Sequence, residues 1–200
     1  MMNSKTNQLL LTGKLINGFT YSHEICGEGF YRTTLKVKRL SGNVDLLPVM
    51  ISERLIDIRG TYDETVQITG QLRSYNRDTE EKHHLELFVF VQDIIEIAGD
   101  PEEINDVFLD GFLCKPPVYR ETPLGREITD LLIAVNRGYG KSDYIPSIAW
   151  GRNARYLSGW KVGDRIQVQG RFQSREYIKC TEDGRKETRT AYELSIRSIK

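Results

Sequence analysis

The chain has 200 residues, with 28 basic side chains, 28 acidic side chains and 39% hydrophobic residues, a composition typical of a globular protein. No apolar run is long enough for a transmembrane helix, and the polar N-terminus argues against a signal peptide. The three cysteines are odd in number and lack metal-ligand spacing, so we expect free thiols in a reducing cytoplasm. The balanced charge hides an asymmetry, because residues 105–200 hold 17 basic and 12 acidic side chains. A basic second half is compatible with a polyanionic partner.

The two halves of the sequence repeat one pattern. When residues 7–52 are shifted by 98 positions, 11 of 46 residues are identical, whereas roughly 6% identity, or about three matches, is expected by chance. Beyond Gly60 the offset becomes 100. The identical pairs include Asn7/Asn105, Gly13/Gly111, Arg39/Arg137, Asp45/Asp143, Pro48/Pro146, Gly70/Gly170 and Ser74/Ser174. The repeat predicts an internal duplication, with a first domain at 1–98, a linker at 99–104 and a second domain at 105–200.

Hydrophobic periodicity predicts the elements of the first copy. They are strands at Leu9–Leu15, Tyr31–Arg39 and Val44–Ile51, a helix at Glu53–Arg59, and strands at Thr65–Tyr75 and His84–Val91.

The second copy repeats this order. We expect strands at Val107–Leu113, Thr129–Asn136 and Asp143–Trp150, a helix at Asn153–Trp160, and strands at Arg165–Tyr177 and Thr190–Ile199, with a Pro-rich loop at Lys115–Arg126. Five short strands and one helix without helical crossovers indicate an all-β fold. The prediction is two tandem five-stranded OB-fold barrels, with one short helix per domain.

One face of the long strand in the second copy is polar and basic. Opposite its apolar residues it carries Gln167, Gln169, Arg171, Gln173, Arg175 and Tyr177. A solvated sheet face is the plain interpretation of this pattern. Nearby aromatic residues favour a second interpretation, in which unpaired bases stack on aromatic rings and cations contact the phosphates. The predicted stacking residues are Tyr139, Tyr144, Trp150 and Tyr177, and the predicted phosphate contacts are Arg137, Lys141, Arg152, Arg155, Arg171, Arg175 and Lys179.

The first copy lacks these aromatic residues at the equivalent positions, where it has Ser41, Leu46, Ser52 and Arg77. We therefore expect it to bind weakly through charge or to serve as an assembly surface. Its candidate secondary contacts are Lys38, Arg39, Arg73, Tyr75 and Arg77.

Other residues have structural interpretations. Trp160 is expected to cap the bottom of the second barrel, and the apolar run Phe88–Phe90 to serve core packing or a subunit contact. His83 and His84 are expected in a solvated loop. We find no nucleophile–base motif and no metal or cofactor motif, so a non-enzymatic protein without cofactors is expected.

Several segments of the second copy resemble the bacterial single-stranded DNA-binding protein family. They are residues 131–137, 143–152, 161–164 and 168–177, with residues 117–125 similar to the family's first loop. The resemblance implies an OB-fold, sequence-independent binding of single-stranded DNA, and base stacking on Tyr139, Tyr144, Trp150 and Tyr177. Members usually assemble four OB-folds, so a tandem chain implies a homodimer. They usually also carry a flexible tail with an acidic tip, whereas this sequence ends at Lys200 after its last strand, as expected of a relative such as primosomal replication protein N.

The leading hypothesis is a cytoplasmic protein that binds single-stranded DNA in replication, recombination or repair, associated with the nucleoid. The alternative is an adaptor that binds other replication proteins and has weak affinity for nucleic acid. Binding of RNA instead of DNA stays open, because stacking does not read the 2′-hydroxyl.

Overall fold

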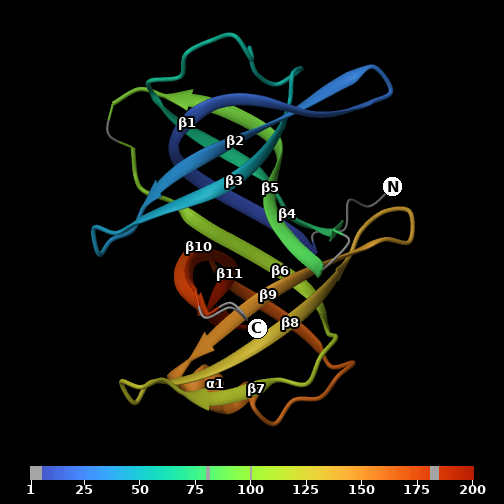
Figure 1. Cartoon of the computed structure of the whole chain (residues 1–200), viewed down its shortest axis with the longest axis vertical. Helices are drawn as coiled ribbons and strands as arrows, with labels where there is room; N and C mark the ends of the chain where they lie inside the picture. Colours follow the sequence, from blue (N-terminus) through green and yellow to red (C-terminus); the bar gives the residue numbers. More distant parts are fainter. Residues whose placement is uncertain (1–5, 80–81, 100, 181–184) are drawn as a thin grey trace.

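The structure is a computed structural model that describes residues 6–79, 82–99, 101–180 and 185–200; for residues 77–79 and 82–84 the description covers the backbone. Its first half forms a barrel from five strands, seen in blue to green in Figure 1. They are β1 (Asn7–Ile25), β2 (Glu28–Lys38), β3 (Val44–Ser52), β4 (Thr65–Thr79) and β5 (Lys82–Ile97). The barrel closes because β1 pairs with both β2 and β4, while β3 and β5 pair in parallel.

The second half repeats this arrangement, in green to red in Figure 1. It contains β6 (Asn105–Leu113), β7 (Val118–Glu121), β8 (Glu127–Asn136), β9 (Ser142–Trp150), α1 (Gly151–Leu157), β10 (Arg165–Cys180) and β11 (Lys186–Ile199). Strand β6 pairs with both β8 and β10, and β9 and β11 pair in parallel. Both halves thus have the same strand order, and the predicted all-β OB-fold architecture is confirmed.

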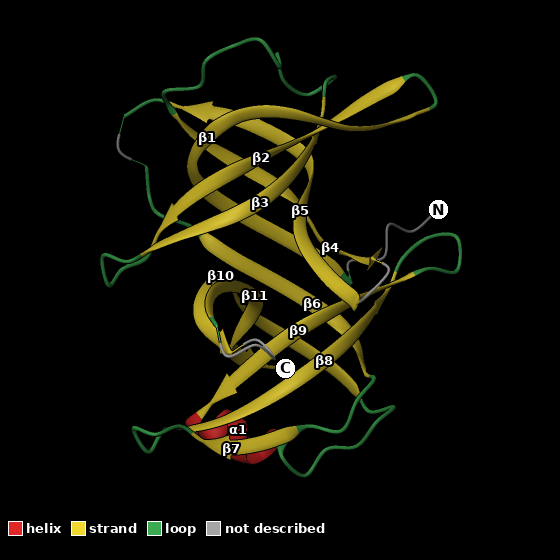
Figure 2. Cartoon of the chain, in the orientation of Figure 1, coloured by secondary structure: helices red, strands yellow, loops and turns green. Residues whose placement is uncertain are grey.

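Several predicted elements differ from the structure. The helix expected at Asn153–Trp160 is α1 at Gly151–Leu157, and His83 and His84, expected in a solvated loop, lie in β5, where their backbone pairs with β4. The expected helix at Glu53–Arg59 is wrong, because the chain there makes successive turns, and Figure 2 shows helix only in the second half of the described chain. The Asp57 carboxylate accepts a hydrogen bond from the backbone N–H of Arg59, and such local side-chain bonds compete with helix formation. In the second copy, part of the expected Pro-rich loop forms β7, which pairs with β8.

The repeated glycines mark places where strands approach each other closely. A Cβ atom on Gly13 would collide with the carbonyl oxygen of Lys36, and one on Gly111 with that of Ala134. Gly70 and Gly170 lie in the same way against Phe90 and Ser195, next to register shifts in β4–β5 and β10–β11. Glycine is required where a barrel strand bends this sharply against its neighbour.

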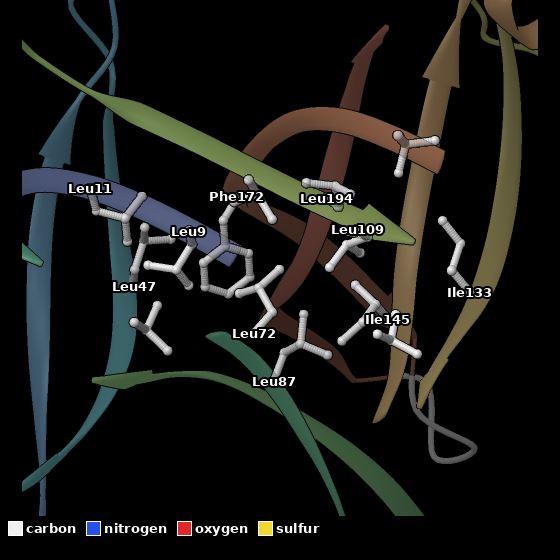
Figure 3. Packing of buried hydrophobic residues seen from close by; sticks show 14 of the residues in the cluster. Leu9, Leu11, Leu47, Leu72, Leu87, Leu109, Ile133, Ile145, Phe172 and Leu194 are labelled. Carbon is white, nitrogen blue, oxygen red and sulfur yellow. The ribbon is translucent and has the colours of Figure 1, made fainter. Parts of the chain in front are cut away.

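The two barrels join through an antiparallel pair between β1 and β6, which makes one 11-stranded sheet. Leu9 pairs with Val107, its own equivalent in the repeat, and Asn7↔Leu109 and Leu11↔Asn105 lie symmetrically on either side. This pairing is that of a two-fold related interface, in which the same patch of each barrel contacts the other. One cluster of buried residues runs through both barrels, and Figure 3 shows Leu9, Leu72 and Phe172 within it.

Candidate nucleic-acid interface

Three of the predicted stacking residues are half-exposed on strands of the second barrel. Tyr144 and Trp150 on β9 are 40% and 38% exposed, and Tyr177 on β10 is 38% exposed. Ile148, which lies between the first two on the same side of β9, is buried. Partly embedded rings lose little side-chain entropy when a base stacks on them, because the barrel already holds them in place.

Tyr139 differs from these three residues. It lies in the turn between β8 and β9 with a positive φ of 62°, and its side chain is fully exposed. The turn therefore presents the ring to solvent without support from neighbouring side chains, and any stacking on it must first order the side chain.

The predicted phosphate contacts fall into two groups. Lys141 and Arg152 are exposed, and Lys179 is partly exposed, on the turn before β9, on α1 and on β10. The others have side-chain partners. Arg155 lies 3.0 Å from the Glu127 carboxylate, Arg175 lies 3.5 Å from Glu193 and 6.0 Å from the Tyr177 ring centre, and Arg171 donates to the Gln173 side chain at 3.0 Å. Burial, followed by the nearby Arg39, lowers the pKa of Arg171 from its ordinary value, because both oppose its positive charge.

Arg137 belongs to an ion-pair cluster at the junction of the barrels. The Asp143 carboxylate is buried there, 3.4 Å from Arg137 and 3.6 Å from Arg73 of the first barrel. It also accepts a hydrogen bond from the backbone N–H of Ser74 at 2.9 Å. Burial raises the pKa of Asp143, and the backbone hydrogen bond and the two arginines partly offset this effect.

The equivalent residues form a matching cluster on the other side of the junction. Buried Asp45 accepts hydrogen bonds from Arg39 at 2.8 Å and from the backbone N–H of Ser174 at 2.7 Å. The hydrogen bond to Asp45 raises the pKa of Arg39 from its ordinary value. Each aspartate thus holds the other barrel's serine, which explains why Arg39/Arg137, Asp45/Asp143 and Ser74/Ser174 are repeated in the sequence. The repeated Arg, Asp and Ser positions can be seen in the sequence, but their structural role depends on contacts between residues that are distant in the chain.

The predicted secondary contacts of the first barrel lie in different surroundings. Arg39 and Arg73 have the buried carboxylates as partners, which gives them a structural role, and Lys38 lies 3.6 Å from Glu103. Tyr75 is 48% exposed on β4. The side chain of Arg77 lies outside the described residues, as do those of His83 and His84. Of the positions equivalent to the second-barrel aromatics, Leu46 is half-exposed and Ser52 is buried.

Trp160 is partly buried against the core, where its ring meets the edge of Tyr156 at 5.6 Å. The two rings line a hollow of about 410 Å³ together with Arg152, Arg197 and Lys200. Trp160 therefore retains some contact with solvent, so its fluorescence can respond to a bound ligand as that of Trp150 can.

A groove of about 740 Å³ between the barrels, here called the inter-barrel groove, is not evident from the sequence. Its walls include Phe88 and Phe90 from β5, Tyr75 and Arg73 from β4, and Tyr144 from the second barrel. The apolar run at Phe88–Phe90 predicts core packing or a subunit contact. The alternation on β5 instead buries Leu87, Val89 and Val91 and leaves both phenylalanines partly exposed.

The second half of the chain matches a known protein family. Residues 104–200 match the model of the "Single-strand binding protein family". This half of the chain is therefore similar to the single-strand binding protein family. The resemblance predicted from its segments is therefore confirmed.

Individual relatives agree with this assignment. The chain is 36% identical over 81 residues to single-stranded DNA-binding protein A of Bacillus subtilis, which covers 37% of this chain and 47% of that protein. A similar match to single-stranded DNA-binding protein 1 of Staphylococcus aureus is 36% identical over 81 residues and covers 37% and 48% of the two chains. The match thus spans about half the length of these relatives.

The solved structure of the single-stranded DNA binding protein from Thermus aquaticus has the same fold over nearly the whole chain. Its TM-score is 0.74 at 22% identity, with 97% of this chain and 91% of that chain covered. The common fold therefore includes both barrels. Separately, in the described part of the chain no helix is long and apolar enough to span a membrane.

Proposed function

We propose that the chain binds single-stranded DNA without sequence specificity and that the second barrel provides most of the affinity. Bases stack on Tyr144, Trp150 and Tyr177, with Tyr139 as an exposed additional platform. Lys141, Arg152, Arg155, Arg171, Arg175 and Lys179 contact the phosphates. Stacking on aromatic rings accepts any base, because every base has a π-face, and cations contact the backbone irrespective of sequence.

The observation that carries the proposal is the set of half-exposed rings on β9 and β10, in the half of the chain that matches the single-strand binding protein family model. Rings that served only the core would be buried, as Phe172 is. The match to the single-strand binding protein family favours DNA binding over the adaptor hypothesis, since half-exposed aromatic residues beside arginines also occur at protein-binding faces.

A role in phosphate contact remains a prediction for Arg39, Arg73 and Arg137. Their ion pairs with Asp45 and Asp143 do not favour that role. A guanidinium that left its buried carboxylate for a phosphate would leave that charge unpaired, at a cost of several kcal/mol. The exposed Lys141 and Arg152 have no such cost.

The proposal includes a homodimer of tandem chains, which gives four OB-folds, and a non-enzymatic role in replication, recombination or repair in the cytoplasm, at the nucleoid. Sedimentation equilibrium tests the oligomeric state. A mass of about 46 kDa, twice the chain mass of 23.0 kDa, supports the dimer, and a mass of one chain contradicts it.

The test of binding is fluorescence titration with oligo-dT in a Trp160→Phe background, where Trp150 is the only remaining tryptophan. The substitution is needed because Trp160 is only partly buried. We expect strong quenching that is reversed by salt, since phosphate contacts release counterions. Affinity without quenching would contradict stacking on Trp150, and absence of affinity at low salt would contradict the proposed function.

A further inference from the structure

The inter-barrel groove has the chemistry of a nucleotide-binding surface on the barrel that lacks the predicted platform. Phe88, Phe90, Tyr75 and Tyr144 present aromatic rings to it. The Phe90 ring lies 5.9 Å from buried Phe30, which itself stacks on His23 at 5.1 Å, so Phe30 supports an aromatic wall of the groove from behind. Its volume of about 740 Å³ falls within the roughly 300–1,000 Å³ that is typical of ligand sites.

The charge of the groove suits an anionic ligand. Among the described residues that line it, three are arginines (Arg32, Arg73 and Arg137) and none is acidic. Arg73 and Arg137 share the single carboxylate of Asp143, which leaves a net positive charge. The Nε atom of Arg73 is buried without a hydrogen-bond partner, and the guanidinium lies 5.4 Å from the Phe90 ring centre. Arg32 has Glu86 at 3.6 Å, an exposed pair that solvent screens.

The four aromatic residues of the groove have no aromatic equivalents on the related side of the junction. By sheet register Phe88 corresponds to Glu193 and Phe90 to Ser195, since these pairs lie opposite Arg73/Gln173 and Gln71/Arg171. Tyr75 and Tyr144 correspond to Arg175 and Leu46. The symmetric framework does not require aromatic rings here, so their concentration needs a separate explanation.

A second groove between the barrels provides an internal contrast. It has a volume of about 440 Å³ and contains Tyr177, Glu86 and Glu193, with no lysine or arginine among the described residues that line it. Phosphates would meet two carboxylates in that groove, although Arg175 partly neutralises Glu193. The inter-barrel groove is therefore the more favourable path for a nucleic-acid backbone.

Tyr144 links this groove to the second barrel. Its backbone N–H donates to the Ser74 hydroxyl at 2.7 Å, and Ser74 N–H donates to Asp143, so the junction fixes Tyr144 next to Tyr75. We infer that the inter-barrel groove binds a second run of unpaired nucleotides, which continues from the second barrel across Tyr144 onto Tyr75, Phe88 and Phe90. This inference rests on the proposed function and extends it to the first barrel.

The experiment compares short and long oligo-dT on the full chain by fluorescence anisotropy of labelled DNA. A strand of about 6 nucleotides can occupy one barrel, whereas one of about 20 can span both, given roughly 4–16 nucleotides per OB-fold. The variants are Phe88→Ala and Phe90→Ser, which places the second barrel's residue at position 90. The matched control is Ile95→Ala, because Ile95 is half-exposed on the same strand and does not line the groove.

We expect each groove variant to bind the long strand about 5- to 150-fold more weakly, as loss of one stacked base at 1–3 kcal/mol implies, and to bind the short strand like the control. Because Phe90 contacts Phe30, Tyr75→Ala serves as a further variant with a smaller effect on packing, and thermal unfolding monitors the fold. Equal affinity of all variants and the control for the long strand would overturn the inference, and so would equal losses for both strands. If the unmodified protein binds neither strand, the proposed function itself fails.

Discussion

Removal of the Asp143 carboxylate is predicted to loosen the junction between the barrels. In Asp143→Ala, Arg137 and Arg73 are deprived of their shared partner, and the backbone N–H of Ser74 of its acceptor. Breaking a buried ion pair on one side typically costs about 3–5 kcal/mol, because the remaining charge stays buried and uncompensated. Arg73 and Arg137 are 20% and 31% exposed at their side chains, so water compensates part of this cost. We therefore expect the free energy of unfolding to fall by about 2–4 kcal/mol.

Urea denaturation followed by circular dichroism measures this decrease. Asp45→Ala should cost a similar amount, because its carboxylate makes the equivalent contacts to Arg39 and Ser174. Asp130→Ala is the exposed control: its ion pair with Arg120 lies at the surface, and its removal should cost under about 1 kcal/mol. If replacing each buried aspartate lowers the free energy of unfolding no more than Asp130→Ala does, the clusters do not hold the barrels together and the reasoning is refuted.

Proton binding, glycine packing and salt dependence each provide a further test. The raised pKa of Asp143 means that the folded protein binds a proton more readily than the unfolded chain, so this group's contribution to stability should fall as the pH rises above the ordinary carboxyl pKa of about 4. The difference between the protein and Asp143→Asn across this range checks the sign, and a contribution that rises with pH contradicts it. Gly111→Ala should lower the free energy of unfolding by about 1–3 kcal/mol, because the new Cβ collides with the Ala134 carbonyl, and an unchanged urea midpoint would show that the bend tolerates a side chain. Replacing the exposed Lys141 and Arg152 by Gln should reduce the slope of log affinity against log salt by about 0.7 for each phosphate that is no longer neutralised, whereas an unchanged slope would remove both from the interface.

The sequence was sufficient to predict the barrel architecture because the relevant signals are local. Alternation along residues 165–177 separated the buried Ile166, Val168 and Phe172 from the polar face. The repeated glycines, which indicated the duplication, lie where strands approach each other closely in both barrels. Where local chemistry competes with periodicity the prediction failed, as at Glu53–Arg59, where the Asp57 carboxylate supports a turn.

The junction and its groove could not be predicted in the same way. Asp45 and Asp143 contact serines that are 129 and 69 residues away in the chain, and no local pattern shows which distant N–H a carboxylate will accept. The aromatic wall is hard to recognise in the sequence because Phe88 and Phe90 occur in an apolar run, where alternation is hidden by the valine between them. Their position opposite Tyr144 depends on how the two barrels pack, which is a property of the folded chain.

The central claim is that stacking on the second barrel dominates affinity. Its most direct test is the affinity of the Trp150→Ala/Tyr177→Ala variant for oligo-dT, measured by anisotropy of labelled DNA at constant salt. We predict a decrease of about 2–6 kcal/mol in binding free energy for the two rings together, with the fold intact by circular dichroism, because both side chains are about 38% exposed and lie outside the core. If the double variant binds oligo-dT as tightly as the unmodified protein, stacking on this face does not provide the affinity and the account is contradicted.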